Sequence, residues 1–152
     1  MRLLIYILSV LLAAACSESD NSTPDAEGIM IAVIDGTQWE ANSQQNVIHV
    51  LSNFQLSGKN VGDQSTITIL LTGVNGPGTY EIKDGNSATF LSESENTVFG
   101  TNDDNTGTLT ITSLTATRAK GTFSFDAENV LGGTAGTTIS VRNGEFDVPV
   151  SN

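Results

Sequence analysis

The chain has 152 residues, with seventeen acidic against six basic side chains and a formal net charge of −11. Such an acidic surface repels phosphate backbones and anionic headgroups, so composition argues against a nucleic-acid-binding protein. The chain has one cysteine, which excludes an intramolecular disulfide even in a compartment that would permit one.

The first sixteen residues predict an export signal that ends at this cysteine. Arg2 gives a positive start, an almost unbroken apolar run follows, and Ala13–Ala15 places small side chains directly before Cys16. The run is shorter than the roughly 20 residues of a permanent membrane-spanning helix and has the layout of a secretory signal. The cysteine resembles that of the bacterial lipobox, whose thiol is lipidated and becomes the mature N-terminus, although Leu12 lies one place farther from it than the commonest lipobox leucine. We expect residues 1–15 to be a signal peptide and Cys16 to be the lipidation site.

Residues 16–28 are expected to form a flexible tether behind the lipidated cysteine. The stretch from Ser17 to Glu27 is polar and acidic and shows no periodicity. Its eleven residues span about 36 Å when fully stretched, which would hold a domain just clear of a membrane surface. Glu18 and Asp20 loosely resemble the surface-export signal of some Bacteroidota lipoproteins. We therefore expect an exported protein anchored to the outer membrane, facing either the periplasm or the cell surface.

Residues 29–152 predict a single all-β domain. Short segments with alternating apolar and polar side chains are separated by turn residues, and no window shows a helical stripe. We expect about eight to ten antiparallel strands. The expected extended segments are residues 29–34, 38–41, 47–51 with 54–56, 66–69, 79–82, 88–91, 97–99, 108–112, 122–127, 138–142 and 146–150.

The clearest strand pair lies in the second half of the domain. Residues 108–112 and 122–127 alternate regularly and predict an antiparallel hairpin, with Phe123 and Phe125 facing inward. Asn143-Gly144 is the strongest short hairpin signal and predicts a turn between two further strands. Because the inward residues are bulky, we expect a filled antiparallel β-sandwich; the alternative is a closed up-and-down or lipocalin-like β-barrel.

Several motifs in a fixed order resemble a known family. They are Ile34-Asp35-Gly36 with Trp39-Glu40-Ala41, Gly78-Thr79-Tyr80, and the runs 107–112, 121–127 and 143–148. Behind a lipobox, this order resembles a family of small Bacteroidota lipoproteins known only as domain of unknown function 6252. The likeness covers most of residues 29–150. It implies an envelope location and a β fold, and it brings no catalytic residue or ligand.

Candidates for catalytic chemistry are few. His49 is the only histidine, which excludes a multi-histidine metal site and means that any Ser–His–acid triad would have to use it. Alternation places His49 opposite Ile48 and Val50, as a strand histidine that either faces solvent or has its hydrogen bonds satisfied. The glycines of 132–136 lack the lysine and the helix of a phosphate-binding loop, so we interpret them as a flexible loop.

Acidic pairs and one tryptophan offer weak binding hypotheses. Asp103 and Asp104 concentrate oxygen donors that calcium would accept, but they lack the spaced ligands of an EF-hand and fit a hairpin turn better. Glu93 and Glu95 are a local carboxylate pair of the kind that glycosidases use. Trp39 could stack on a sugar, whereas its polar neighbours favour a strand with the indole in the core.

Together these features predict a non-enzymatic envelope lipoprotein without a cofactor. We expect a monomer whose β domain binds or scaffolds a glycan or an envelope protein, while the N-terminal lipid holds it at the membrane. One alternative is a glycan-processing hydrolase whose carboxylates are brought together by folding. Another is an apolar-ligand carrier, which would need a hollow interior.

Overall fold

The computed structural model describes residues 28–151, so the predicted signal peptide, Cys16 and most of the tether lie outside the described residues. The described part of the chain forms eleven strands and no helix, which confirms the all-β prediction and slightly exceeds the expected strand number. The strands are β1 (Ile29–Ile34), β2 (Thr37–Glu40), β3 (Ser43–Val50), β4 (Asn53–Asn60), β5 (Ser65–Leu71), β6 (Gly78–Ile82), β7 (Ser87–Ser92), β8 (Thr97–Gly100), β9 (Gly107–Leu114), β10 (Arg118–Leu131) and β11 (Thr138–Ser151).

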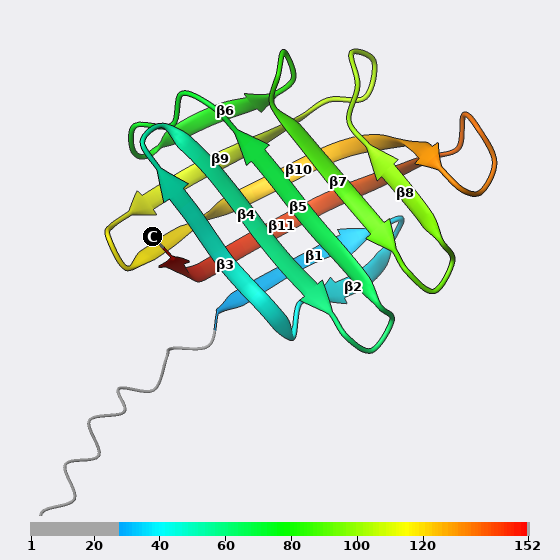
Figure 1. The fold of residues 1–152 in the computed structure, drawn as a ribbon, viewed down its shortest axis with the longest axis horizontal. Helices are drawn as coiled ribbons and strands as arrows, with labels where there is room; N and C mark the ends of the chain where they lie inside the picture. The colour runs from blue at the N-terminus through cyan, green and yellow to red at the C-terminus, as the bar shows by residue number, and fades with distance from the viewer. Residues whose placement is uncertain (1–27, 152) are drawn as a thin grey trace, which may run out of the picture.

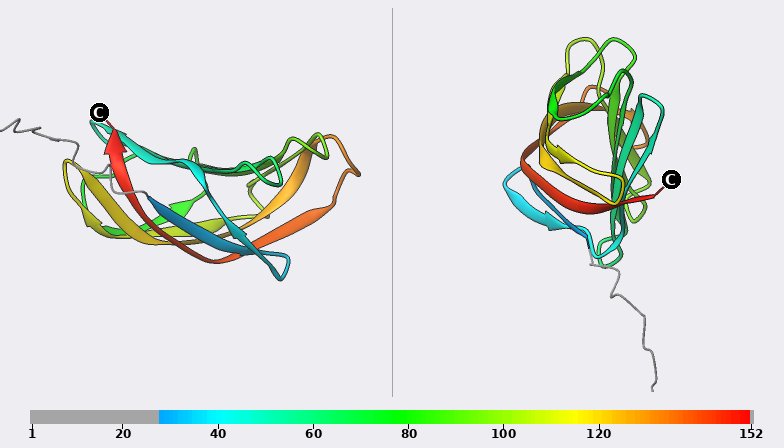
Figure 2. Two further views of the ribbon diagram at one scale, coloured as in Figure 1. Left: turned by 90° about the horizontal axis from the view of Figure 1, so that it is seen from below. Right: turned by 90° about the vertical axis from the view of Figure 1, so that its left-hand side faces the viewer.

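The strands lie in two layers, as expected for a sandwich. In Figure 1, β3, β4, β5, β7 and β8 form the front layer and cross over β6, β9, β10, β11, β1 and β2 behind them. Figure 2 shows the two layers edge on. Hydrogen bonding continues through all eleven strands in the order β2-β1-β11-β3-β4-β5-β7-β8-β10-β9-β6, with β10 and β11 also paired, so the layers belong to one mixed sheet.

One strand pair corrects the expectation of a wholly antiparallel sheet. The end of β11 runs parallel to β3, with Val150 opposite Val47 and Ser151 opposite Ile48. All the other pairings are antiparallel. The short parallel contact joins the two layers at one side, and the pairing of β10 with β8 joins them at the other.

The predicted turn at Asn143-Gly144 is wrong, because both residues lie inside the continuous strand β11. Phe123 of β10 faces Gly144 and Phe125 faces Val141, so β11 carries one residue more than its partner between these two pairs. Asn143 has a φ of 51°, as expected at a β-bulge, whereas Gly144 is not among the residues with positive φ. A type I′ hairpin turn needs positive φ at both central residues. The bulge keeps the apolar residues on both sides of it facing the core.

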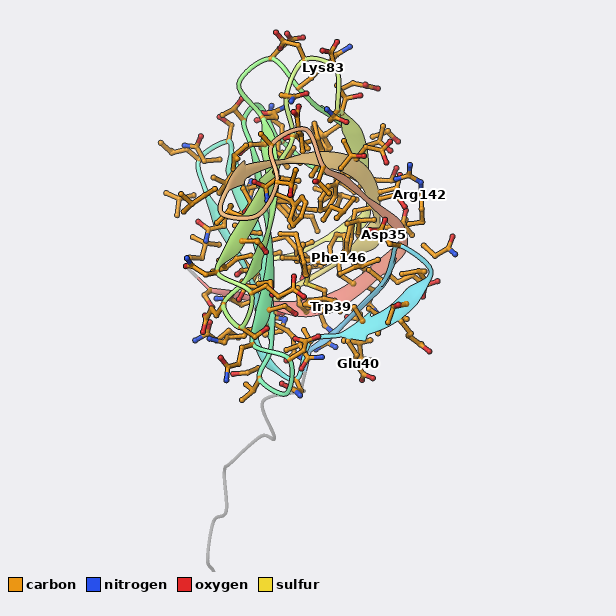
Figure 3. All side chains as sticks on the ribbon, turned by 90° about the vertical axis from the view of Figure 1, so that its right-hand side faces the viewer. Asp35, Trp39, Glu40, Lys83, Arg142 and Phe146 are labelled. Atoms are coloured by element: carbon orange, nitrogen blue, oxygen red, sulfur yellow. The ribbon has the colours of Figure 1, made fainter. Side chains whose placement is uncertain are left out.

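Apolar side chains fill the space between the layers. Figure 3 shows Trp39 and Phe146 pointing into this space, whereas Lys83 and Arg142 lie at its periphery. The largest fully buried side chains are Phe54, Phe125, Met30, Leu56, Ile67, Ile69, Leu71, Ile82, Leu109, Ile111, Val47 and Val74. Phe123 and Phe125 are buried, as the alternation predicted.

Two glycines make room for large rings in this core. A Cβ at Gly144 would lie 2.5 Å from the Phe123 ring, and a Cβ at Gly121 would lie 2.8 Å from the Phe146 ring. Each phenylalanine therefore packs over a glycine of the neighbouring strand. This packing occupies the interior that a carrier of apolar ligands would have to leave open.

Candidate functional site

Three loops without carboxylates gather at one end of the sandwich, which we call the acid-free end. They are residues 51–52, 72–77 and 115–117, and none of them contains Asp or Glu. The backbone N–H of Val74 donates to the carbonyl of Ser52 at 2.9 Å, and that of Val150 donates to the carbonyl of Thr117 at 3.0 Å. The first bond ties loop 72–77 to the turn 51–52, and the second ties loop 115–117 to the end of β11, which pairs with β3. All three loops lie on the left-hand side of Figure 1.

An apolar patch lies on the outer surface at this end. It consists of Ile48, Val50, Leu51 and Leu70, whose exposed fractions are 41%, 52%, 88% and 45%. Ile48 and Leu70 both flank Gln55 on adjacent strands, because Gln55 pairs with each of them. An exposed group of this kind on an acidic domain marks a binding surface more often than a solitary exposed leucine does.

The patch lines an open groove of about 330 Å³ on the front layer. Its lining residues are Ile48, Val50, Asn53, Phe54, Gln55, Leu70, Leu71, Thr72 and Gly85, and none of them carries a charge. Lys83 and Asp84, which precede Gly85, have opposite charges. The groove therefore presents aliphatic, amide and hydroxyl groups rather than an electrostatic site.

Leu51 is the most unusual residue of the patch. It occupies the first position of the two-residue turn between β3 and β4 with a φ of 58°, a region that favours Gly, Asn and Asp and disfavours leucine. The other non-glycine residues with positive φ in residues 28–151 are all Asp, Asn or Gln: Asp35, Gln44, Gln64, Asp84, Asn96 and Asn143. A leucine that is both strained and exposed is a candidate for a functional residue.

The apolar patch stands on a well-packed base. His49, on the opposite face of β3 from Ile48 and Val50, is half-buried, and its Nε2 donates to the Val74 carbonyl at 3.1 Å. This agrees with the predicted alternative of a histidine with a satisfied hydrogen bond. The Phe54 ring lies 6.3 Å from the imidazole and 6.5 Å from the Phe146 ring. The turn that carries Leu51 is therefore fixed from below by aromatic packing.

The opposite end of the front layer carries the predicted acidic pair, and we call it the carboxylate end. Asp63, Glu93 and Glu95 lie exposed on the loops 61–64 and 93–96. The backbone N–H of Glu93 donates to the carbonyl of Gln64 at 2.9 Å, which holds the two loops together. Lys59 forms an ion pair with Glu93 at 2.7 Å. Glu93 is thus engaged by a cation, and both predicted acids lie on an exposed loop.

Hydroxyl groups face inward at the carboxylate end. Ser65, Ser92 and Thr97 are buried and lie side by side on three adjacent strands, because Ser92 pairs with each of the other two. Trp39 is only 3% exposed, and its Nε1 donates to Ser65 Oγ at 2.7 Å. Ser65 Oγ in turn donates to the Asp63 carboxylate. The indole therefore lies in the core, as its polar neighbours predicted, and not at a surface where it could stack on a sugar.

The predicted calcium loop is organised by an asparagine rather than by its acids. Asn102 Oδ1 accepts the backbone N–H of Asp104 at 3.0 Å and that of Asn105 at 2.8 Å. The side chains of Asp103 and Asp104 are exposed on this loop. Across residues 28–151, no three or more His, Cys, Asp or Glu side chains lie close enough together to hold a metal ion.

One carboxylate near the acid-free end is neutralised by two cations. Arg118 Nε donates to Asp147 Oδ1, and Lys120 Nζ lies 2.7 Å from Oδ2. Partial burial acts to raise the pKa of Asp147, but the hydrogen bonds and positive charges of Lys120 and Arg118 outweigh it, so the pKa lies below its ordinary value of 3.8. Asp147 therefore adds little net negative charge to this end.

Sequence reasoning missed the apolar patch, although the sequence holds a signal for it. Residues 47–51 place apolar side chains on both faces of β3, where a half-buried strand would alternate. The sequence does not tell which face of β3 is inward or which loops meet beside it.

The glycine-rich segment 132–136 joins β10 to β11 as an exposed loop.

Comparison with known proteins places the chain in a family. The model of the family described as Domain of unknown function (DUF6252) matches residues 26–149, which is most of the chain, and the chain belongs to that family. Neither the curated proteins nor the solved structures contain a match. Within residues 28–151 there is no helix long and apolar enough to cross a membrane.

Proposed function

We propose that this member of the family is a lipoprotein of the bacterial cell envelope. Its β domain binds or scaffolds a partner outside the cytoplasm without catalysing a reaction. The observation that carries the proposal is the N-terminal sequence, in which a charged residue, an apolar run and three alanines precede the only cysteine. That order is the one required for export followed by lipidation of Cys16. The lipid on Cys16 would hold the protein at the outer membrane.

The arrangement of the acids supports the non-catalytic part of the proposal. A glycosidase needs two carboxyl groups about 5–9 Å apart across a substrate cleft. The local acidic pairs of the sequence, Glu93 with Glu95 and Asp103 with Asp104, each lie exposed on a single loop, and Glu93 is held by Lys59. The filled core and the open groove of the acid-free end suit binding at the surface.

Mass spectrometry of the protein extracted from membranes tests the anchor directly. The expected mature chain begins at Cys16 and carries the added mass of its acyl groups. Cys16→Ser should release the protein from the membrane or stall its processing, whereas Ser19→Ala, as a matched control in the tether, should leave both unchanged. A mature terminus at another residue, or normal cleavage and membrane retention of the Cys16→Ser variant, would contradict the proposal.

A further inference from the structure

The apolar patch needs an occupant, and the position of the tether indicates which one. A Cβ at Gly28 would lie 2.9 Å from the Gln45 side chain and 3.0 Å from that of Val148, so the tether leaves the domain beside β3. Val50 lies five positions after Gln45 along β3, which corresponds to about 17 Å. The eleven residues Ser17–Glu27 reach about 36 Å when extended. An anchor at Cys16 therefore brings Leu51 within reach of the membrane.

Charge determines which end of the domain can approach that surface. Envelope membranes contain anionic headgroups, which repel carboxylates within about a Debye length. Asp63, Glu93 and Glu95 carry three negative charges against the single positive charge of Lys59, and therefore disfavour an approach by the carboxylate end. The three loops of the acid-free end contain no acid, and Asp147 beside them is paired with two cations. Electrostatics thus turns the acid-free end toward the lipid.

The shape and chemistry of the patch match the interfacial region of a bilayer. Leu51 protrudes from a turn with 88% of its surface exposed, and Val50, Ile48 and Leu70 continue the apolar surface behind it. Asn53, Gln55 and Thr72 border the groove with groups that can hydrogen-bond to headgroups. Apolar side chains with an uncharged polar border are suited to shallow insertion at the boundary of headgroups and acyl chains.

We propose that the acid-free end of the domain docks on the lipid surface, with Leu51 inserted below the headgroups. This inference rests on the proposed lipid anchor, because four side chains alone bind a bilayer weakly, whereas tethering raises their effective concentration at the surface. Docking fixes the orientation of the domain. The second layer and the carboxylate end then face away from the membrane.

A fluorescent label at residue 51 tests the docking in the acylated full chain. Lipidation blocks the sulfur of Cys16 as a thioether, so the new thiol of Leu51→Cys is the only free one and can carry an environment-sensitive dye. The protein is reconstituted in vesicles of phosphatidylethanolamine with a minority of phosphatidylglycerol. The matched control is Val61→Cys, an exposed apolar residue in the loop 61–64 of the carboxylate end. We expect a blue shift and quenching by brominated acyl chains at residue 51, and neither at residue 61.

A second pair of variants separates docking from folding. Leu51→Asn places a polar residue that tolerates positive φ in the turn, so the fold is retained while the insertion is lost. With the dye moved to residue 70 by Leu70→Cys, Leu51→Asn should abolish most of the quenching by brominated lipid. Val61→Asn, the control at the other end, should leave it unchanged.

The outcomes distinguish this inference from the proposed function. A chain without acyl groups by mass spectrometry overturns both. An acylated chain whose label at residue 51 stays in water overturns the docking alone. A blue shift without quenching by brominated lipid means that a protein, either a partner or a second copy, covers the patch, and this also overturns lipid docking.

Discussion

The two ends of the front layer invert the usual distribution of polar and apolar side chains in opposite ways. At the acid-free end, Leu51 and its aliphatic neighbours face solvent above a base of aromatic rings. At the carboxylate end, Ser65, Ser92 and Thr97 face the core below a rim of acids. A leucine held at positive φ and a buried hydroxyl group each lower the free energy of unfolding unless a contact compensates for them.

Ser65 at the carboxylate end is compensated within the domain, whereas Leu51 at the acid-free end is not. The buried hydroxyl of Ser65 has partners within the domain, because it accepts from Trp39 and donates to Asp63. For the exposed Leu51, no compensating contact is visible in residues 28–151, and the proposed compensation comes from the membrane. We therefore expect substitutions at the carboxylate end to change the stability of the fold, and substitutions at the acid-free end to change binding to the membrane.

The largest effect is expected from Phe54→Ala, which removes the aromatic base of the acid-free end. Phe54 is almost completely buried between His49 and Phe146, so truncation leaves a cavity and should lower the free energy of unfolding by about 3–5 kcal/mol. Urea denaturation of the purified protein measures it, with the exposed Val61→Ala as a control expected to change little. A loss below about 1 kcal/mol would show that this base is loosely packed.

At the carboxylate end, Ser65→Ala should lower the free energy of unfolding by about 1–3 kcal/mol, because it leaves the buried indole N–H of Trp39 without its partner. Denaturant unfolding monitored by far-ultraviolet circular dichroism gives the value in every variant, because Trp39→Phe removes the only tryptophan of the chain. Trp39→Phe in the same background removes the orphaned donor. The double mutant should therefore lose less than the sum of the two single losses, and strict additivity would disprove the coupling.

Thr97→Val should act in the opposite direction. Thr97 Oγ1 is buried and has no hydrogen-bond partner among the described residues. Replacing the hydroxyl by a methyl group of similar size removes a desolvated polar atom and should raise the free energy of unfolding by about 1 kcal/mol. Thermal unfolding compares the variant with the parent. A loss as large as that of Ser65→Ala would mean that a buried water satisfies this hydroxyl.

The smallest effect concerns pH at the acid-free end. The folded-state pKa of Asp147 lies below its unfolded value, so its contribution is present above about pH 4 and is lost as pH falls through the folded pKa. For a partly exposed ion pair we expect at most about 1 kcal/mol. Asp147→Asn should reduce the loss of unfolding free energy at acid pH, measured by urea titrations at several pH values. Lys120→Met should reduce this loss partly. If the acid-dependent loss is the same in both variants as in the parent, Asp147 is not its cause.

Strand positions were predictable because alternation directly reports a half-buried strand. Residues 29–34 form β1 as expected, and residues 108–112 pair with residues 122–127 in the predicted hairpin. The error at Asn143-Gly144 arose because a local turn signal competed with longer pairing. The odd spacing from Val141 to Phe146 was the available signal, since both are buried and only an extra residue between them allows this within one strand.

The candidate site was less predictable than the strands because it depends on contacts between distant segments. The loop 72–77 is joined to the turn at residues 51–52 by the bond from Val74 to Ser52, and sequence spacing does not indicate that bond. Alternation in residues 47–51 also leaves both faces apolar. The burial of Trp39 was weighed correctly from its polar neighbours, since these identify the outward face of β2.

The central place of β11 has a consequence for the order of assembly. This strand pairs with β1, β3 and β10, so the opening strand of the domain finds its long partner only in the last strand of the domain. Contacts between such remote segments form slowly, because a long loop must close before any of them is gained. The nascent chain therefore stays incomplete until residues 138–151 emerge. If such a chain crosses a translocation pore in extended form, the domain does not have to be unfolded first.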